Sequence, residues 1–186
     1  MVTMTARALA ILAAALSLAG AGCGSSTKSR TQAPVGQASI AVTSDFAAGA
    51  TIPRAHTCDG RDLSPPLRVA GLPAGTRELV IVMRDPDAPG GNFVHWAIAH
   101  VDPAGARTAS LPGGAMPAGT VLGRNSFGTL GYRGPCPPTG SAPHHYHLTV
   151  YVLGRPSMLK TGFSADAVAA LPALATGSLI GLYGRH

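Results

Sequence analysis

The sequence predicts a mostly β protein, folded as an antiparallel β-sandwich with one or two short helices. Short segments of strand length recur along the chain from Ser39 onward, and several are rich in branched apolar residues. Between them, Gly and Pro (24 and 16 residues in total) recur every few positions. Because both residues interrupt regular structure, they exclude long helices and favour the turns of an antiparallel sandwich.

The individual elements follow from the same pattern. Clear strands are predicted at residues 40–43, 77–83, 93–101 and 147–153, and a last strand at 176–183. The second of these contains a continuous apolar run, which is typical of a buried strand. Helical character is confined to residues 164–171, where Ser164 is suited to cap the helix N-terminus.

The first 22 residues have the features of an export signal. Arg7 precedes an apolar run at residues 8–21, which is shorter than the roughly 20 residues that span a bilayer. Its length and the small residues at its end are typical of a signal peptide. The small residues before Cys23 resemble a bacterial lipobox, in which the cysteine is acylated, although Gly20 stands where that pattern prefers an aliphatic residue. An ordinary signal peptide is the alternative.

The predicted organisation is therefore a signal peptide (1–22), a lipidated Cys23 with a flexible tether (23–38), and one domain (39–186). The tether is small, polar and contains proline, which is typical of a flexible linker. We expect an exported protein on the extracytoplasmic face of the cell membrane, held there by an acyl chain such as palmitate on Cys23.

Charge is sparse and does not indicate a nucleic-acid partner. The formal net charge is +6 at pH 7, with 12% charged residues, and the basic residues are scattered singly. A nucleic-acid site normally shows clustered Lys and Arg, often interleaved with aromatic residues. The basic excess is compatible with mild attraction to an anionic membrane or to small anions.

Two cysteines, Cys58 and Cys136, fall within the predicted domain. In an exported protein they could pair as a disulfide, or they could remain two separate buried thiols. The chain has no CxxC motif, so neither a redox dithiol nor a cysteine-based zinc site is indicated.

Two segments contain clusters of acidic, histidine and proline residues, which are unusual in a β-sandwich of purely structural role. The first is residues 85–89 (DPDAP), followed by His95 and Trp96, and the second is residues 134–140 (GPCPPTG), followed by residues 144–147 (HHYH). The prolines of the first segment must end the preceding strand, which leaves two carboxylates on a rigid loop.

Strand alternation sorts the histidines of the second segment. Residues at odd spacings face opposite sides of a strand, so His144 and Tyr146 share one face and His145 lies on the other. His144 and Tyr146 are therefore expected to line one small site together, from which His145 is excluded.

These two segments resemble the signatures of the phosphatidylethanolamine-binding protein family. The closer resemblance is to its bacterial YbhB/YbcL branch of Raf-kinase-inhibitor-like proteins. The family's DPDAP and HW are intact, and its GPxPPxG and HRY appear as residues 134–140 and 144–146. Residues 58–67 and 125–132 also resemble this branch, and the similarity extends over roughly residues 39–186.

The resemblance implies a sandwich of this family's type with a small anion-binding pocket at its edge. Carried over by position, the pocket residues are Asp85, Asp87, His95, Gly134, His144 and Tyr146. One departure is His145, where the family usually has Arg. Because a histidine is mostly uncharged at neutral pH, positive charge is weaker at that position.

The chemistry of these residues favours a non-enzymatic binding site for a phosphorylated or zwitterionic anion, such as a phospholipid head group. A carboxylate that accepts one ring N–H of a histidine leaves its other nitrogen to face the ligand, and Tyr146 adds a neutral donor. A monoprotonated phosphate could donate its own O–H to a carboxylate. No cofactor is expected.

Two other functions are weighed against binding. A protein-interaction module could inhibit an extracytoplasmic protease or signalling partner, and residues 111–117 (LPGGAMP) are the candidate apolar loop. An enzyme or metal site is disfavoured, because HExxH is absent and adjacent strand residues cannot face one metal. Ser126 also lacks the GxSxG spacing of a nucleophile elbow. The resemblance further suggests a homodimer.

Overall fold

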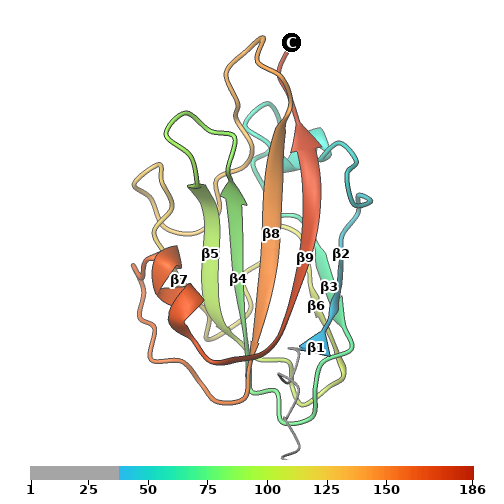
Figure 1. Cartoon of the computed structure of the whole chain (residues 1–186), viewed down its shortest axis with the longest axis vertical. Helices are drawn as coiled ribbons and strands as arrows, with labels where there is room; N and C mark the ends of the chain where they lie inside the picture. The colour runs from blue at the N-terminus through green and yellow to red at the C-terminus, as the bar shows by residue number, and fades with distance from the viewer. Residues whose placement is uncertain (1–37) are drawn as a thin grey trace, which may run out of the picture. The chain divides into compact units, whose positions relative to one another are not determined.

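The computed structural model describes residues 38–186, which are built mainly from β-strands (Figure 1). The strands are β1 (Ala38–Ser39), β2 (Ala41–Thr43), β3 (Leu67–Ala70), β4 (Glu78–Asp85), β5 (Phe93–Val101), β6 (Thr108–Leu111), β7 (Val121–Leu122), β8 (His144–Leu153) and β9 (Ala173–Tyr183). Two short 3₁₀ helices, η1 (Arg54–His56) and η2 (Ala165–Ala170), complete the described elements. The predicted signal peptide, Cys23 and the tether up to residue 37 lie outside the described residues.

The strands form two sheets, which confirms the predicted mostly β, antiparallel architecture. The large sheet has six strands in the order β1-β9-β8-β4-β5-β7, and the small sheet has three in the order β2-β3-β6. The short β1 runs parallel to β9, while the other paired strands run antiparallel. Within residues 38–186, no helix is long and apolar enough to cross a membrane.

The apolar run in β4 is explained by burial on both faces of the large sheet. One face contributes Leu79, Ile81 and Met83 to the main core, which also holds Trp96 and side chains of the small sheet. The other face contributes Val80 and Val82 to a second cluster around Phe163 and Val168, close to η2. A central strand buried on both sides has no need of polar alternation.

The predicted helix at residues 164–171 is present as the 3₁₀ helix η2. The hydroxyl of Ser164 accepts a hydrogen bond from the backbone N–H of Asp166 at 3.2 Å, so the predicted cap is also present. Strand β8 begins three residues earlier than expected, at His144, because its first residues pair with the end of β9 in the register His144 to Tyr183. The sequence did not predict β3, β6 or β7, which have four residues or fewer.

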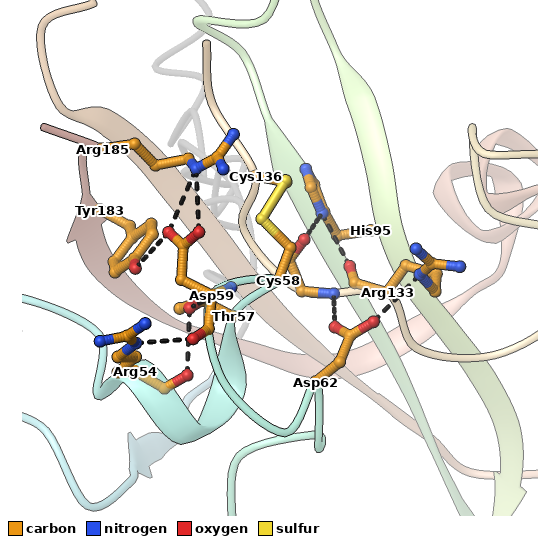
Figure 2. Close-up of a disulfide and its surroundings, with 11 residues drawn as sticks. Arg54, Thr57, Cys58, Asp59, Asp62, His95, Arg133, Cys136, Tyr183 and Arg185 are labelled. Atoms are coloured by element: carbon orange, nitrogen blue, oxygen red, sulfur yellow. Dashed lines mark hydrogen bonds and ion pairs between the residues drawn. A yellow bond between two sulfur atoms is a disulfide. The ribbon is translucent and has the colours of Figure 1, made fainter. Parts of the chain in front are cut away.

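A disulfide joins the loop after η1 to the loop before β8 (Figure 2). Cys58 and Cys136, for which the sequence left pairing open, form this bond with their Cα atoms 5.4 Å apart. The bond connects segments 78 residues apart in the chain, beside the end of the large sheet where β8 begins.

Candidate functional site

The residues singled out by the sequence gather at one end of the large sheet. Because β4 runs antiparallel to both β5 and β8, the end of β4 lies beside the beginnings of its two neighbours (Figure 1). Strand β4 ends at Asp85, directly before Pro86, as the proline predicts. This end of the sheet therefore brings together Asp85, His95 and His144 from three adjacent strands.

A buried carboxylate orients His144. Its Nδ1 lies 2.8 Å from Asp85 Oδ2, and the two side chains are 9% and 4% exposed. The other oxygen of Asp85 accepts the backbone N–H of Asp87 at 2.8 Å. A carboxylate oxygen can only accept from the ring, so Nδ1 carries the proton and Nε2 is left to meet a ligand.

His95 is held differently, by two backbone carbonyls. Its Nδ1 lies 2.7 Å from the carbonyl oxygen of Arg133 and 3.1 Å from that of Gly134. Burial lowers the pKa of His95 below its ordinary value, although the Arg133 carbonyl and the charge of Asp85 partly oppose this effect. The ring is therefore neutral at neutral pH, with its proton on Nδ1 and an acceptor lone pair on Nε2.

Tyr146 lies between the two histidines and carries a buried hydroxyl that lacks a partner. Its ring centroid is 5.2 Å from His95 and 6.5 Å from His144. The residue is 1% exposed, and its hydroxyl forms no hydrogen bond of good geometry with any of residues 38–186, although the Asp85 carboxylate lies nearby. Burial, and next the charge and hydrogen-bonding contact of Asp85, raise the pKa of Tyr146, so it remains a phenol that can donate. Buried hydroxyls are nearly always paired, which makes this one informative.

The carboxylate of Asp87 is engaged outside this group. Its Oδ2 accepts the backbone N–H of His145 at 2.7 Å and the ring Nδ1 of the same residue at 2.8 Å. These bonds lower the pKa of Asp87. His145 lies on the exposed side of β8, as the alternation predicts. Asp87 was expected to line the pocket. It is instead hydrogen-bonded to His145, which strand alternation places outside the pocket.

Gly134, predicted to line the pocket, lies next to His95, and close packing explains the glycine. A side chain at this position would collide with the backbone of His56 and Thr57 and with the carboxylate of Asp62. Its N–H donates to Asp62 Oδ1 at 2.6 Å. The sequence did not single out Asp62, although it belongs to the segment 58–67 that resembles the bacterial branch.

Aromatic residues that were not predicted flank His95. The rings of Phe93 and Phe127 lie 5.2 Å and 5.4 Å from its centroid, and 4.9 Å from each other. The guanidinium of Arg133 lies 5.2 Å from the Phe127 ring, and Phe127 is 40% exposed. Phe127 could have been found from the sequence, because it belongs to residues 125–132, which resemble the bacterial branch. These rings lower the polarity around His95, in keeping with its lowered pKa.

Together these groups can recognise a small ligand with both acceptor and donor atoms. His144 in its protonated form and Tyr146 supply donors, while His95 supplies an acceptor. In the part of the chain that the structure describes, no three His, Cys, Asp or Glu side chains converge as a set of metal ligands.

Comparison with known proteins identifies the family of this chain. The family described as phosphatidylethanolamine-binding protein matches residues 42–183. A UPF0098 protein of Pyrococcus abyssi is 38% identical over 156 residues, covering 81% of this chain and 88% of that protein. The Mycobacterium tuberculosis protein named "Putative lipoprotein LppC" is 41% identical over 145 residues, covering 78% of this chain and 69% of that protein.

A solved structure shows the same relationship. The Escherichia coli protein YbcL, described as a member of the mammalian PEBP family, aligns with a TM-score of 0.70 and 31% identity. The alignment covers 80% of this chain and all of that chain (100%). The family match over most of the domain, the sandwich and the two signature segments lead to one conclusion: the chain belongs to the phosphatidylethanolamine-binding protein family.

Proposed function

We propose that the pocket formed by Asp85, His95, His144 and Tyr146 binds a small phosphorylated or zwitterionic anion resembling a phospholipid head group. The observation that carries this proposal is the buried Tyr146 hydroxyl, which makes no well-formed hydrogen bond among residues 38–186 and has only the Asp85 carboxylate close by. An unmade hydrogen bond of a buried group costs about 1–3 kcal/mol. A ligand oxygen placed between Tyr146 and His144 would recover that cost.

The charges favour a ligand with a limited negative charge. None of the four residues Asp85, His95, His144 and Tyr146 is an arginine or lysine; the cation among them would be His144 in its protonated form, paired with Asp85 at 2.8 Å. Since Asp85 already balances that proton, a dianion would be left partly uncompensated. A monoprotonated phosphate or phosphoethanolamine fits better, because its O–H or ammonium group can donate to Nε2 of neutral His95.

A binding role agrees with membership of the phosphatidylethanolamine-binding protein family. The pair Asp85–His144 resembles the orienting half of a nucleophile-activating triad, but among residues 38–186 no hydroxyl or thiol is bonded to His144 Nε2. The relative named as a lipoprotein supports the proposal that this domain is exported and anchored through Cys23. An anchored domain would meet head groups at high local concentration.

Calorimetric titration tests the proposal. The chain from residue 23 onward, with Cys23→Ser to leave it unlipidated, is titrated with inorganic phosphate, phosphoethanolamine and short-chain phosphatidylethanolamine. We expect binding that is lost in His144→Ala. His145→Ala is the matched control, because that side chain lies on the outer side of the same strand, and it should bind as the parent does.

Absence of binding heat with every ligand, from a chain shown to be folded, would contradict the proposal. The alternative, a module that inhibits a protease or signalling partner, would then be favoured. In the loop expected to serve that role, Leu111 is buried in β6, whereas Met116 is 43% exposed and is the apolar side chain available to a partner.

A further inference from the structure

Two loops beside the pocket are joined by a disulfide and several hydrogen bonds (Figure 2). The first loop is residues 56–62 and the second is residues 132–136; their mutual contacts are called the clamp below. Besides the disulfide between Cys58 and Cys136, the clamp includes a hydrogen bond of 3.1 Å from the Cys58 N–H to the carbonyl of Pro135. The clamp thus joins segments that are far apart in the sequence.

Asp62 provides the polar part of the clamp. Its Oδ1 accepts the Gly134 N–H at 2.6 Å, and its Oδ2 lies 3.0 Å from Arg133 Nε. Asp62 also has φ of 56°, in the left-handed region, which is uncommon for a residue other than glycine. On the same side, the Tyr132 hydroxyl donates to the carbonyl of His56. These contacts determine how the peptide between Arg133 and Gly134 is oriented.

The clamp reaches the pocket through His95. The carbonyls of Arg133 and Gly134 are the two acceptors for His95 Nδ1, at 2.7 Å and 3.1 Å. The Arg133 N–H returns a bond of 2.9 Å to the His95 carbonyl, which ties this end of the loop to β5. The N–H of Gly134 is bonded to Asp62 instead. If this peptide turned, His95 would lose the Arg133 carbonyl, the nearer of the two acceptors that keep its proton on Nδ1.

We infer that Asp62 and the Cys58–Cys136 disulfide position His95, so that ligand affinity depends on Asp62 and on the disulfide being oxidised. This inference rests on the proposed function, because it concerns the same pocket. Neither Asp62 nor the cysteines need touch the ligand. They act by holding the carbonyls that set the tautomer and orientation of the His95 ring.

The disulfide is placed where a reductant can reach it. Cys136 is an exposed residue between two prolines, whereas Cys58 is half-buried. The thiolate of a dithiol reductant would attack the Cys136 sulfur; the S–S bond breaks, and Cys58 leaves as a thiolate and takes up a proton. The second thiol of the reductant then displaces and protonates Cys136. Two electrons pass to the protein, and the reductant becomes a disulfide. Exposed disulfides are among the more readily reduced.

The chain offers a matched control for Asp62. Asp59 lies in the same loop, next to Cys58, and also pairs with an arginine. Its carboxylate is bonded to Tyr183 and Arg185 rather than to residues 132–136. Removal of Asp59 therefore perturbs the same loop without releasing the peptide that holds His95.

The test uses the chain from residue 23 onward with Cys23→Ser, which also removes the third thiol. Asp62→Ala, Asp62→Asn and Asp59→Ala are compared with the parent, oxidised and after reduction with dithiothreitol. The readouts are the ¹⁵N signals of the His95 ring, which report its tautomer, and the affinity for inorganic phosphate. We expect Asp62→Ala and the reduced parent to show a mixture of His95 tautomers and about tenfold weaker phosphate binding. Asp62→Asn should restore much of the His95 signal, since its amide oxygen still accepts from Gly134, and Asp59→Ala should match the parent.

Unchanged His95 signals in folded Asp62→Ala and in the folded, reduced parent would overturn the inference. If reduction unfolds the chain, the His95 signals of oxidised Asp62→Ala alone decide whether the inference holds. If the oxidised parent binds no phosphate, the proposed function fails, and the His95 signals still show whether the clamp positions the ring.

Discussion

Two His–Asp pairs lie next to each other at the end of the large sheet, and they differ in surroundings rather than in length. His144 with Asp85 and His145 with Asp87 each have an Nδ1–Oδ2 distance of 2.8 Å. The first pair is 9% and 4% exposed, and the second is 54% and 43% exposed. Solvent competes with the second pair, while the first has a buried phenol beside it.

This difference shows that pairing alone does not identify a binding site. A salt bridge open to water contributes little to stability and leaves its ring free to be solvated. In the buried pair, Asp85 accepts from Nδ1 of His144, and the second ring nitrogen, Nε2, remains available in surroundings of low polarity. The neighbouring residues, and above all Tyr146, therefore separate the two pairs.

The largest expected difference concerns stability. Asp85→Ala should destabilise the domain by about 3–5 kcal/mol, because it leaves a buried histidine without its partner. Asp87→Ala should cost less than about 1 kcal/mol. Urea unfolding followed by circular dichroism measures both values. Equal losses for the two variants would contradict the contrast drawn between the pairs.

A second prediction concerns Tyr146, beside the buried pair, where ligand affinity and the free energy of unfolding should respond differently. Tyr146→Phe removes a hydroxyl that has no partner among the described residues, so the free energy of unfolding should stay level or rise by up to about 1 kcal/mol. The affinity for phosphate should fall by about tenfold, since one ligand hydrogen bond is lost. Thermal unfolding and calorimetry on the same preparation measure the two effects. A clear loss of stability would show that the hydroxyl is already paired.

The smallest effect concerns the exposed pair in acid. The hydrogen bonds from His145 lower the pKa of Asp87 below its ordinary value of 3.8. A carboxyl whose pKa is lowered by folding stabilises the folded state above its unfolded pKa, and this contribution is lost as pH falls through the folded value. The small advantage of the parent over Asp87→Asn should therefore be largest from about pH 5 upward and should decline steadily as pH falls below about pH 4. Unfolding curves from neutral pH down into this range test it, and an advantage that does not decline below about pH 4 would argue against it.

Local patterns predicted the fold and much of the site, because those features depend on neighbours in the chain. Alternation correctly placed His144 and Tyr146 on one face of β8 and His145 on the other. The apolar run of β4 and the proline after Asp85 predicted where that strand lies and ends. These inferences require only the geometry of one strand.

The rest depended on contacts between distant segments. Asp85 and Asp87 are equivalent in the sequence, and their different partners are decided by the packing of β8, about 60 residues later, as separations of 59 and 58 show. The role of Asp62 depends on Gly134, 72 residues away. Strands β3, β6 and β7 are too short to carry a periodic signal, and their place is set by pairing.

The parallel pairing of β1 with β9 has a consequence for an anchored domain. Ala38 pairs with Ala175 near the start of β9, whereas His144 of the candidate site pairs with Tyr183 at the other end of that strand (Figure 1 shows β1 and β9). The ten residues of β8 cover about 34 Å between these two ends. Residues 24–37, if fully extended, would reach about 45–50 Å. That upper bound exceeds the length of the sheet by less than half. Under the proposed anchoring through Cys23, the number of residues before β1, as much as the chemistry of the site, would decide whether a head group is taken from the anchoring leaflet or from beyond it.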